Sequence, residues 1–190
     1  MILDLFSYFA KYPSREGVLS IFNNGSSSHA QYAELKETIL AMPDPLIPTI
    51  QSYVFGQSFE SVKARIDTLV GTYLFIDYGE FSSRSDNRNS IEDTQKLAAT
   101  IAMKLSDSSD LVEEAISSDT CLEYLNTLRA HLLFDAECGK VFWLNRSNIK
   151  SLDIIPFVSK ELKSIGWTMM FEADGSDLFN VKARMSSFRP

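Results

Sequence analysis

The side chains of this sequence that could do chemistry gather at the end of one strand-like run and in the polar stretch behind it. The run spans residues 71–81, and the polar stretch, rich in Ser, Arg, Asp and Asn, spans residues 82–95. A stretch of this length inside a compact domain is typical of a functional or mobile loop. We interpret five charged residues here as a candidate interaction loop: Asp77, Glu80, Arg84, Asp86 and Arg88.

Asp77 is the most informative of the five, because it interrupts an otherwise apolar run between Ile76 and Tyr78. Burying a lone carboxylate is costly, so its side chain must be exposed, paired or hydrogen-bonded. We expect a solvated face or a pair with a lysine or arginine across the sheet. The alternative is a polar contact to a partner subunit. The two arginines of the loop are expected to be solvated rather than bound to a phosphate.

Paired acids also raise the question of a metal-dependent nuclease. Such an enzyme needs an acid at the end of one strand and a Glu-x-Lys tripeptide on the next. Glu34 with Lys36 and Glu161 with Lys163 match the tripeptide, but we predict both pairs to lie in helices. The match is therefore interpreted as accidental.

The sequence also lacks the residues of the common metal-binding, nucleophilic and phosphate-binding motifs. The two histidines, His29 and His131, have no cysteine or histidine at ligand spacing. The sequence has no Gly-x-Ser-x-Gly elbow, no cysteine-protease signature and no glycine-rich phosphate loop. We predict no catalytic residue, no cofactor and no metal ion, and a protein that is not an enzyme.

Composition is typical of a globular protein. The chain has 190 residues, of which 45% are hydrophobic and 23% are charged, so it can bury its own core. A net charge of −7 argues against nucleic acid as the main ligand, because that affinity depends on clustered lysines and arginines. No run approaches the ~18 apolar residues of a membrane helix, and we expect no membrane partner.

The two cysteines, Cys121 and Cys138, do not form a disulfide framework. If both lie on one helix, they are about 25 Å apart, which is too far for a disulfide. We expect two buried thiols in a reducing compartment. The N-terminal apolar run has no basic residue before it and contains Asp4, so it does not resemble a signal peptide. These features predict a cytoplasmic protein.

Hydrophobic spacing predicts the elements. Residues 106–139 are predicted to be helical with an interruption at residues 117–119, and a short helix is predicted at residues 156–166. Asp-Gly within residues 174–177 predicts a hairpin turn. Four runs are predicted to be strands: residues 71–81, 96–105, 167–173 and 178–185.

Short helices separated by prolines and glycines precede these elements. The apolar residues Ile2, Leu5, Phe6 and Phe9, for example, recur at helical spacing. Blocks of helices and blocks of strands favour an α+β fold over a doubly wound one. We predict a mostly antiparallel sheet of about four strands packed with helices. Two units follow from this pattern: an N-terminal helical segment, residues 1–55, and an α+β core domain, residues 56–190.

The order of the core elements, namely the two runs, the long helix and the C-terminal hairpin, resembles small bacteriophage tail-assembly proteins. These include tail-terminator and head–tail completion proteins, which are α+β subunits that often form rings. The resemblance covers residues 59–187 and depends on element order without a diagnostic motif. It implies no catalytic residue, and it implies that the 82–95 loop contacts ring neighbours or the tail tube.

These observations lead to three hypotheses. The first is a non-enzymatic assembly subunit of a phage or prophage, which self-associates by strand edges or packed helices around a closed ring. It would occupy the cytoplasm of a bacterial host or be carried in the virion. The second is a small cytoplasmic enzyme or ligand-binding domain with a pocket between sheet and helices. The third is a regulatory adaptor that binds its partner through the N-terminal helices.

Overall fold

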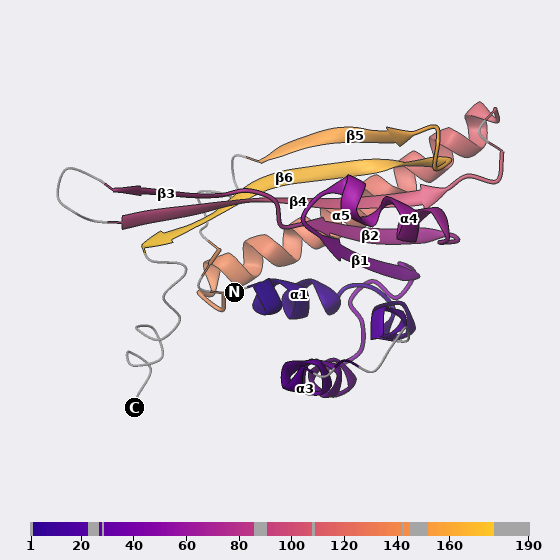
Figure 1. The fold of residues 1–190 in the computed structure, drawn as a ribbon. Coiled ribbons are helices and arrows are strands. Elements are labelled where there is room, and N and C mark those ends of the chain that lie inside the picture. Colours follow the sequence, from indigo (N-terminus) through magenta and orange to yellow (C-terminus); the bar gives the residue numbers. More distant parts are fainter. Residues whose placement is uncertain are drawn as a thin grey trace.

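The computed structural model describes residues 2–22, 27, 29–85, 91–107, 109–141, 143–144 and 152–176 (Figure 1). Its helices are α1 (Ile2–Ala10), α2 (Arg15–Leu19), the 3-10 helix η1 (Ser20–Phe22), α3 (Ala30–Leu40), α4 (Phe59–Asp67) and α5 (Leu111–Glu137). Its strands are β1 (Ser52–Gly56), β2 (Thr72–Asp77), β3 (Phe81–Ser85), β4 (Ile91–Lys104), β5 (Asp153–Ser159) and β6 (Ser164–Ser176).

The six strands form one sheet of order β1-β2-β4-β6-β5, with β3 paired to β4. β1 runs parallel to β2, and every other pair is antiparallel. The α+β prediction is confirmed, but the sheet is mixed and has more strands than the predicted four. β1, β3 and β5 were not predicted as strands, and one of the four predicted strands, residues 178–185, lies outside the described residues.

Most of the stretch predicted as a loop, residues 82–95, is a β-hairpin. Phe81 pairs with Gln95 and Ser85 with Ile91, so β3 and the first part of β4 form an arm that extends past the end of β2 (Figure 1). Its polar residues hide the strand pattern in the sequence. Residues 86–90, which include Asp86 and Arg88, lie outside the described part of the chain.

One face of the sheet packs against α1 and α5. Its strands supply alternate residues to the main core, such as Leu74, Leu97 and Met169, and the helices supply Phe9 and Leu128. The period-2 alternation of strands places these residues on one side. This layer therefore joins the first helix of the chain to the longest one.

On the opposite face, α4 is the one helix among the described residues that packs against the sheet. Phe59, Val62 and Ile66 of that helix contact a smaller cluster that includes Tyr73 and Phe75. Ser58 caps the helix by accepting from the Ser61 backbone N–H at 3.3 Å. Because α4 is short, it covers only part of its face.

The N-terminal segment contributes to the same core as the sheet. The Tyr53 hydroxyl of β1 donates to the Phe6 carbonyl of α1 at 3.0 Å. Arg15 of α2 donates to carbonyls at the end of α3, including those of Ile39 and Met42, both at 2.6 Å. The predicted division at residues 55 and 56 falls inside β1, and whether the two parts fold separately stays a prediction.

α5 is continuous, so the predicted interruption at residues 117–119 is wrong. Ser117 is buried. The Ser118 carbonyl and hydroxyl each accept from the Trp167 indole N–H at 3.1 Å, so the polar groups of Ser118 have a hydrogen-bond partner while the helix continues. Gly139, at φ +63°, follows the C-terminus of the helix as predicted. Both cysteines are free; Cys121 is buried as predicted, but Cys138 is exposed because it caps this helix.

The predicted helix at residues 156–166 is wrong. This segment forms β5, a turn and the start of β6. Pro156 is tolerated because β5 is an edge strand paired only with β6, and an edge residue can do without its N–H. Gly166 serves close packing: a Cβ there would lie 2.0 Å from the Ile101 carbonyl oxygen of β4.

The predicted turn at Asp174 and Gly175 is also wrong. Both residues lie within β6, where they pair with Thr94 and Asp93 of β4. The long partner strand overrides the local turn preference of the Asp-Gly dipeptide. The second predicted arm, residues 178–185, lies outside the described residues.

Candidate functional site: an acidic groove beside α4

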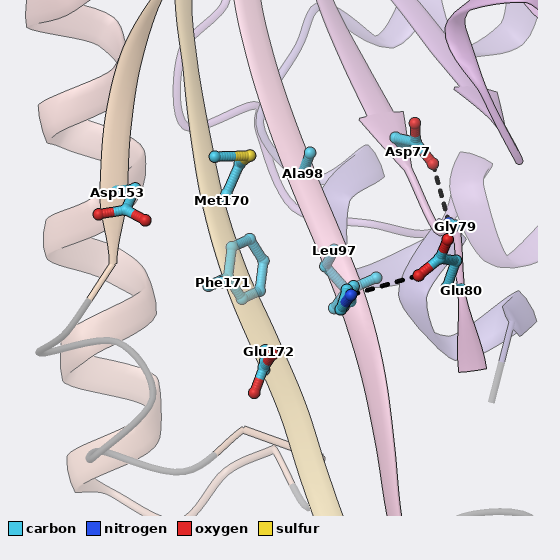
Figure 2. A pocket seen from close by; sticks show the side chains of 10 residues that line it. Asp77, Gly79, Glu80, Leu97, Ala98, Asp153, Met170, Phe171 and Glu172 are labelled. Carbon is cyan, nitrogen blue, oxygen red and sulfur yellow. Dashed lines mark hydrogen bonds and ion pairs between the residues drawn. The ribbon is translucent and has the colours of Figure 1, made fainter. Parts of the chain in front are cut away.

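A shallow groove of about 580 Å³ lies on the part of the sheet that α4 leaves open. Figure 2 shows Asp77 and Glu80 on one side of it, Asp153 on the other, and Ala98 and Met170 between them. β2, β4, β6 and the edge strand β5 supply four of these residues, and Glu80 lies between β2 and β3. The floor is apolar at Ala98 and Met170 and charged at Lys96 and Glu172 of the same two strands, and acids stand at both sides.

Strand register explains why residues far apart in the sequence meet here. Asp77 pairs with Ala98, Ala98 with Met170, and Met170 with Asp153. Directly paired residues share one face of a sheet, so this row crosses four strands on the groove side. A second row begins with Lys96, which pairs with Glu172.

Asp77 is the last residue of β2, and its carboxylate forms a hydrogen bond with the backbone two residues further along the chain. Its Oδ1 accepts from the Gly79 backbone N–H at 2.8 Å. Partial burial raises the pKa of Asp77 above its ordinary value, and the hydrogen bond from Gly79 opposes that rise. Among the described residues, the expected lysine or arginine across the sheet does not pair with this carboxylate, and the alternative of a polar contact to a partner subunit stays a prediction.

Glu80 follows in the turn between β2 and β3. Its carboxylate accepts from the Lys96 ammonium at 3.2 Å, while its carbonyl accepts from the Lys96 backbone N–H at 3.0 Å. Both side chains are largely exposed, so the ion pair contributes little to stability. The pair places one positive charge among the acids of the groove.

The structure thus brings together two of the five predicted site residues, Asp77 and Glu80. Arg84 lies further along β3, with its side chain exposed and outside the groove lining. Asp86 and Arg88 lie outside the described residues. Sequence reasoning missed Lys96, Asp153, Met170 and Glu172, because only strand register places them beside Asp77.

The spacing of the acids limits what the groove can do. The backbones of Asp77 and Asp153 are three strand spacings apart, or about 14 Å. The groove therefore spans four strands between its outer acids. Within the described parts of the chain, no group of three or more His, Cys, Asp and Glu side chains could hold a metal ion.

The two histidines and the Glu-x-Lys pairs lie elsewhere. His29 precedes α3, and His131 of α5 packs edge-on against Tyr12, with ring centroids 6.0 Å apart. Glu34 and Lys36 are helical as predicted. Glu161 lies in a turn instead of a helix, and its carboxylate pairs with Lys63 of α4 at 2.7 Å.

A second cluster of titratable groups joins α1 to α5. Asp135 accepts from the Tyr8 hydroxyl at 2.8 Å and from the Lys11 ammonium at 2.7 Å. Burial raises the pKa of Asp135, but these two bonds, with the charges of Lys11 and Lys140, outweigh burial and leave it below its ordinary value. This cluster is packed between helices and is structural.

An exposed apolar patch covers the start of α5. Leu111, Val112 and Ile116 have relative exposures of 76%, 67% and 63%, and Ala115 beside them is also exposed. Residues four apart lie on one side of a helix, so these side chains form one contiguous surface. We call these four residues the α5 patch.

No protein-family model, curated protein or solved structure matches the chain. Among the described residues, no helix combines the length and the apolar character that crossing a membrane requires.

Proposed function

We propose that this protein is a non-enzymatic assembly subunit that self-associates through the α5 patch. The observation that supports this is the exposure of three large aliphatic side chains within the first two turns of one helix. Contiguous exposed apolar surface is typical of protein–protein contacts. Burying this surface against the same surface of a second copy would remove it from water and stabilise the complex.

The helix start that carries the patch is held in place by hydrogen bonds. The Asp110 carboxylate accepts from the Val112 and Glu113 backbone N–H groups at 2.8 and 3.1 Å. The Glu113 carboxylate accepts from the backbone N–H groups of Ser106 and Asp107 at 2.9 and 3.1 Å. A patch fixed in this way loses little conformational freedom on association.

Helix packing is a better route to association than strand addition. The free edge of β5 carries Pro156, which interrupts the row of backbone donors that a new strand would need. β1 is the outer strand at the other side of the sheet. There Arg65 of α4 donates to the Ser20 hydroxyl of η1 at 2.9 Å, so a hydrogen bond connects two helices that pack on opposite faces of the sheet. Both features disfavour the addition of a strand from a second copy.

We further propose that the assembly belongs to a bacteriophage or prophage tail, on the strength of the two strand runs followed by the long helix. The C-terminal hairpin of that element order adds no support, because its predicted turn lies within β6. The protein would then act in the cytoplasm of a bacterial host or in the virion, with protein partners and no nucleic acid as main ligand. Ring-shaped particles in electron micrographs of the purified protein would support this proposal. Particles with open, fibrous growth would count against it.

The experiment compares two double variants by light scattering after gel filtration. Val112→Glu with Ile116→Glu places charges in the α5 patch and is expected to shift the protein to monomers. The control, Asn126→Glu with Thr127→Glu, adds the same charge at exposed positions of the same helix and should leave the mass unchanged. Equal masses for the two variants, with circular dichroism showing both folded, would contradict the proposal.

The second hypothesis, a ligand-binding domain, is favoured by one observation, the groove beside α4. Its open shape and widely spaced acids suit a macromolecular segment better than a small substrate. The groove lies on the face of the sheet opposite α5. It can therefore act independently of the α5 patch.

A further inference from the structure

The sheet face that carries the groove is only half covered. α4 packs over Tyr73, Phe75 and their neighbours, whereas Met170 and Ile155 further along the same face are 40% and 44% exposed. Thr100 and Thr168, whose hydroxyls lie 2.7 Å apart, form a row with Ile155 at the border of the covered half, and Ala98 and Met170 form the next row. These apolar residues have no covering element among the described residues.

The sides of the groove carry mostly one sign of charge. Among the described residues that line the groove, the acids Asp77, Glu80 and Asp153 stand at its sides, while Glu172 and the base Lys96 lie opposite each other on β6 and β4. Acids stand at both sides, at the end of β2 and at the start of β5. A partner that complements this surface must carry positive charges on both flanks of an apolar strip.

The width of the groove decides the shape of that partner. About 14 Å separates the backbones of Asp77 and Asp153, by three strand spacings. An α-helix with its side chains is about 10–12 Å across. α4 already packs as a helix on the other half of the same face. One further helix would fit between the acids.

We infer that the groove binds a basic amphipathic helix of a partner protein. The apolar face of that helix lies on Met170, Ala98 and Ile155, and its lysines or arginines reach Asp77 on one side and Asp153 on the other. This function is separate from self-association, because the α5 patch lies beyond the opposite face of the sheet. Each exposed ion pair contributes little to the binding affinity, so binding depends on the apolar contact and the ion pairs together.

The test measures fluorescence anisotropy of a labelled leucine–lysine peptide of helical periodicity. The full-length protein is expected to bind it, and salt should weaken the binding. Asp77→Asn with Asp153→Asn should weaken binding about fivefold, which corresponds to two exposed ion pairs. Met170→Ser, which changes no charge, should also weaken binding, because it removes apolar contact area.

A matched control variant loses the same two negative charges on the opposite side of the molecule. Asp119→Asn with Glu123→Gln alters exposed acids of α5 and should leave the affinity within about twofold of wild type. The inference is overturned if wild-type protein fails to bind, if the control weakens binding as much as the groove variant, or if Met170→Ser has no effect. Groove variants should keep the wild-type mass in light scattering, which separates this test from that of self-association.

Discussion

At the residue scale, Asp135 is the polar group on which the packing of α1 against α5 most depends. Its side chain is 11% exposed, and that of its partner Lys11 is 26% exposed. The Lys11 ammonium also lies 3.7 Å from the ring centroid of Tyr8. Burial lowers the pKa of Lys11, and the bond and charge of Asp135 oppose that effect. Each of the two charged groups therefore needs the other in the folded protein.

Asp135→Ala should lower the free energy of unfolding by about 2–3 kcal/mol, because it leaves a half-buried ammonium and a Tyr8 hydroxyl without their acceptor. Since the folded-state pKa of Asp135 is depressed, its stabilisation is present above the unfolded pKa and is lost as pH falls through the folded value. Urea unfolding should show a large deficit for the variant at neutral pH and a smaller one at about pH 3.

Lys140→Gln is the control for this prediction. The Lys140 ammonium is more exposed and lies 3.6 Å from Asp135, so its loss should cost less than about 1 kcal/mol. A deficit for Asp135→Ala that stays constant with pH would show that lost packing, and not charge, accounts for the effect.

Gly166 is the residue at which β6 comes closest to β4. Any larger side chain would meet the Ile101 carbonyl oxygen and the Ala102 Cα, both of which belong to the backbone and cannot move aside. Gly166→Ala should therefore lower the free energy of unfolding by about 1–3 kcal/mol. Thermal unfolding checks this; an unchanged midpoint would mean that the two strands lie further apart than the structure has them.

At the element scale, the apolar stripe of α1 and the apolar parts of β2, β4 and β6 were predicted, whereas β1, β3 and β5 were not. Leu5, Phe6 and Phe9 mark α1 in the sequence because one side of the helix alone is buried. β3 and the start of β4 were not predicted as strands, because most of their residues are polar and do not alternate with apolar ones. Pro156 and the Asp-Gly pair at residue 174 have strong local preferences, yet pairing along β6 overrides both. The local propensity of a residue therefore predicts secondary structure poorly where pairing with a distant strand determines it.

The start of α5 depends on its N-cap. Asp110→Ala removes the acceptor of two backbone N–H groups and should lower the free energy of unfolding by about 1 kcal/mol. Asp110→Asn keeps a capping oxygen and should lose much less. Urea titrations of both variants measure the difference; equal losses would mean that charge at the helix terminus, and not capping, stabilises this end.

At the scale of the whole molecule, the sheet presents two different outer surfaces. One face is packed against α1 and α5, with the α5 patch exposed at the helix start. The other is half covered by α4 and carries the acidic groove. Asp77 and Glu80 could be singled out from the sequence because they lie near the end of a strand-like run. Asp153 and Met170 could not, because only the register across four strands brings them to the same groove.

The central claim is that this chain is built to associate with copies of itself. Light scattering of the purified wild-type protein over a wide concentration range tests it most directly. The account predicts a mass that is a whole-number multiple of one chain, or that rises toward such a multiple with concentration. A mass of a single chain at every concentration would contradict it.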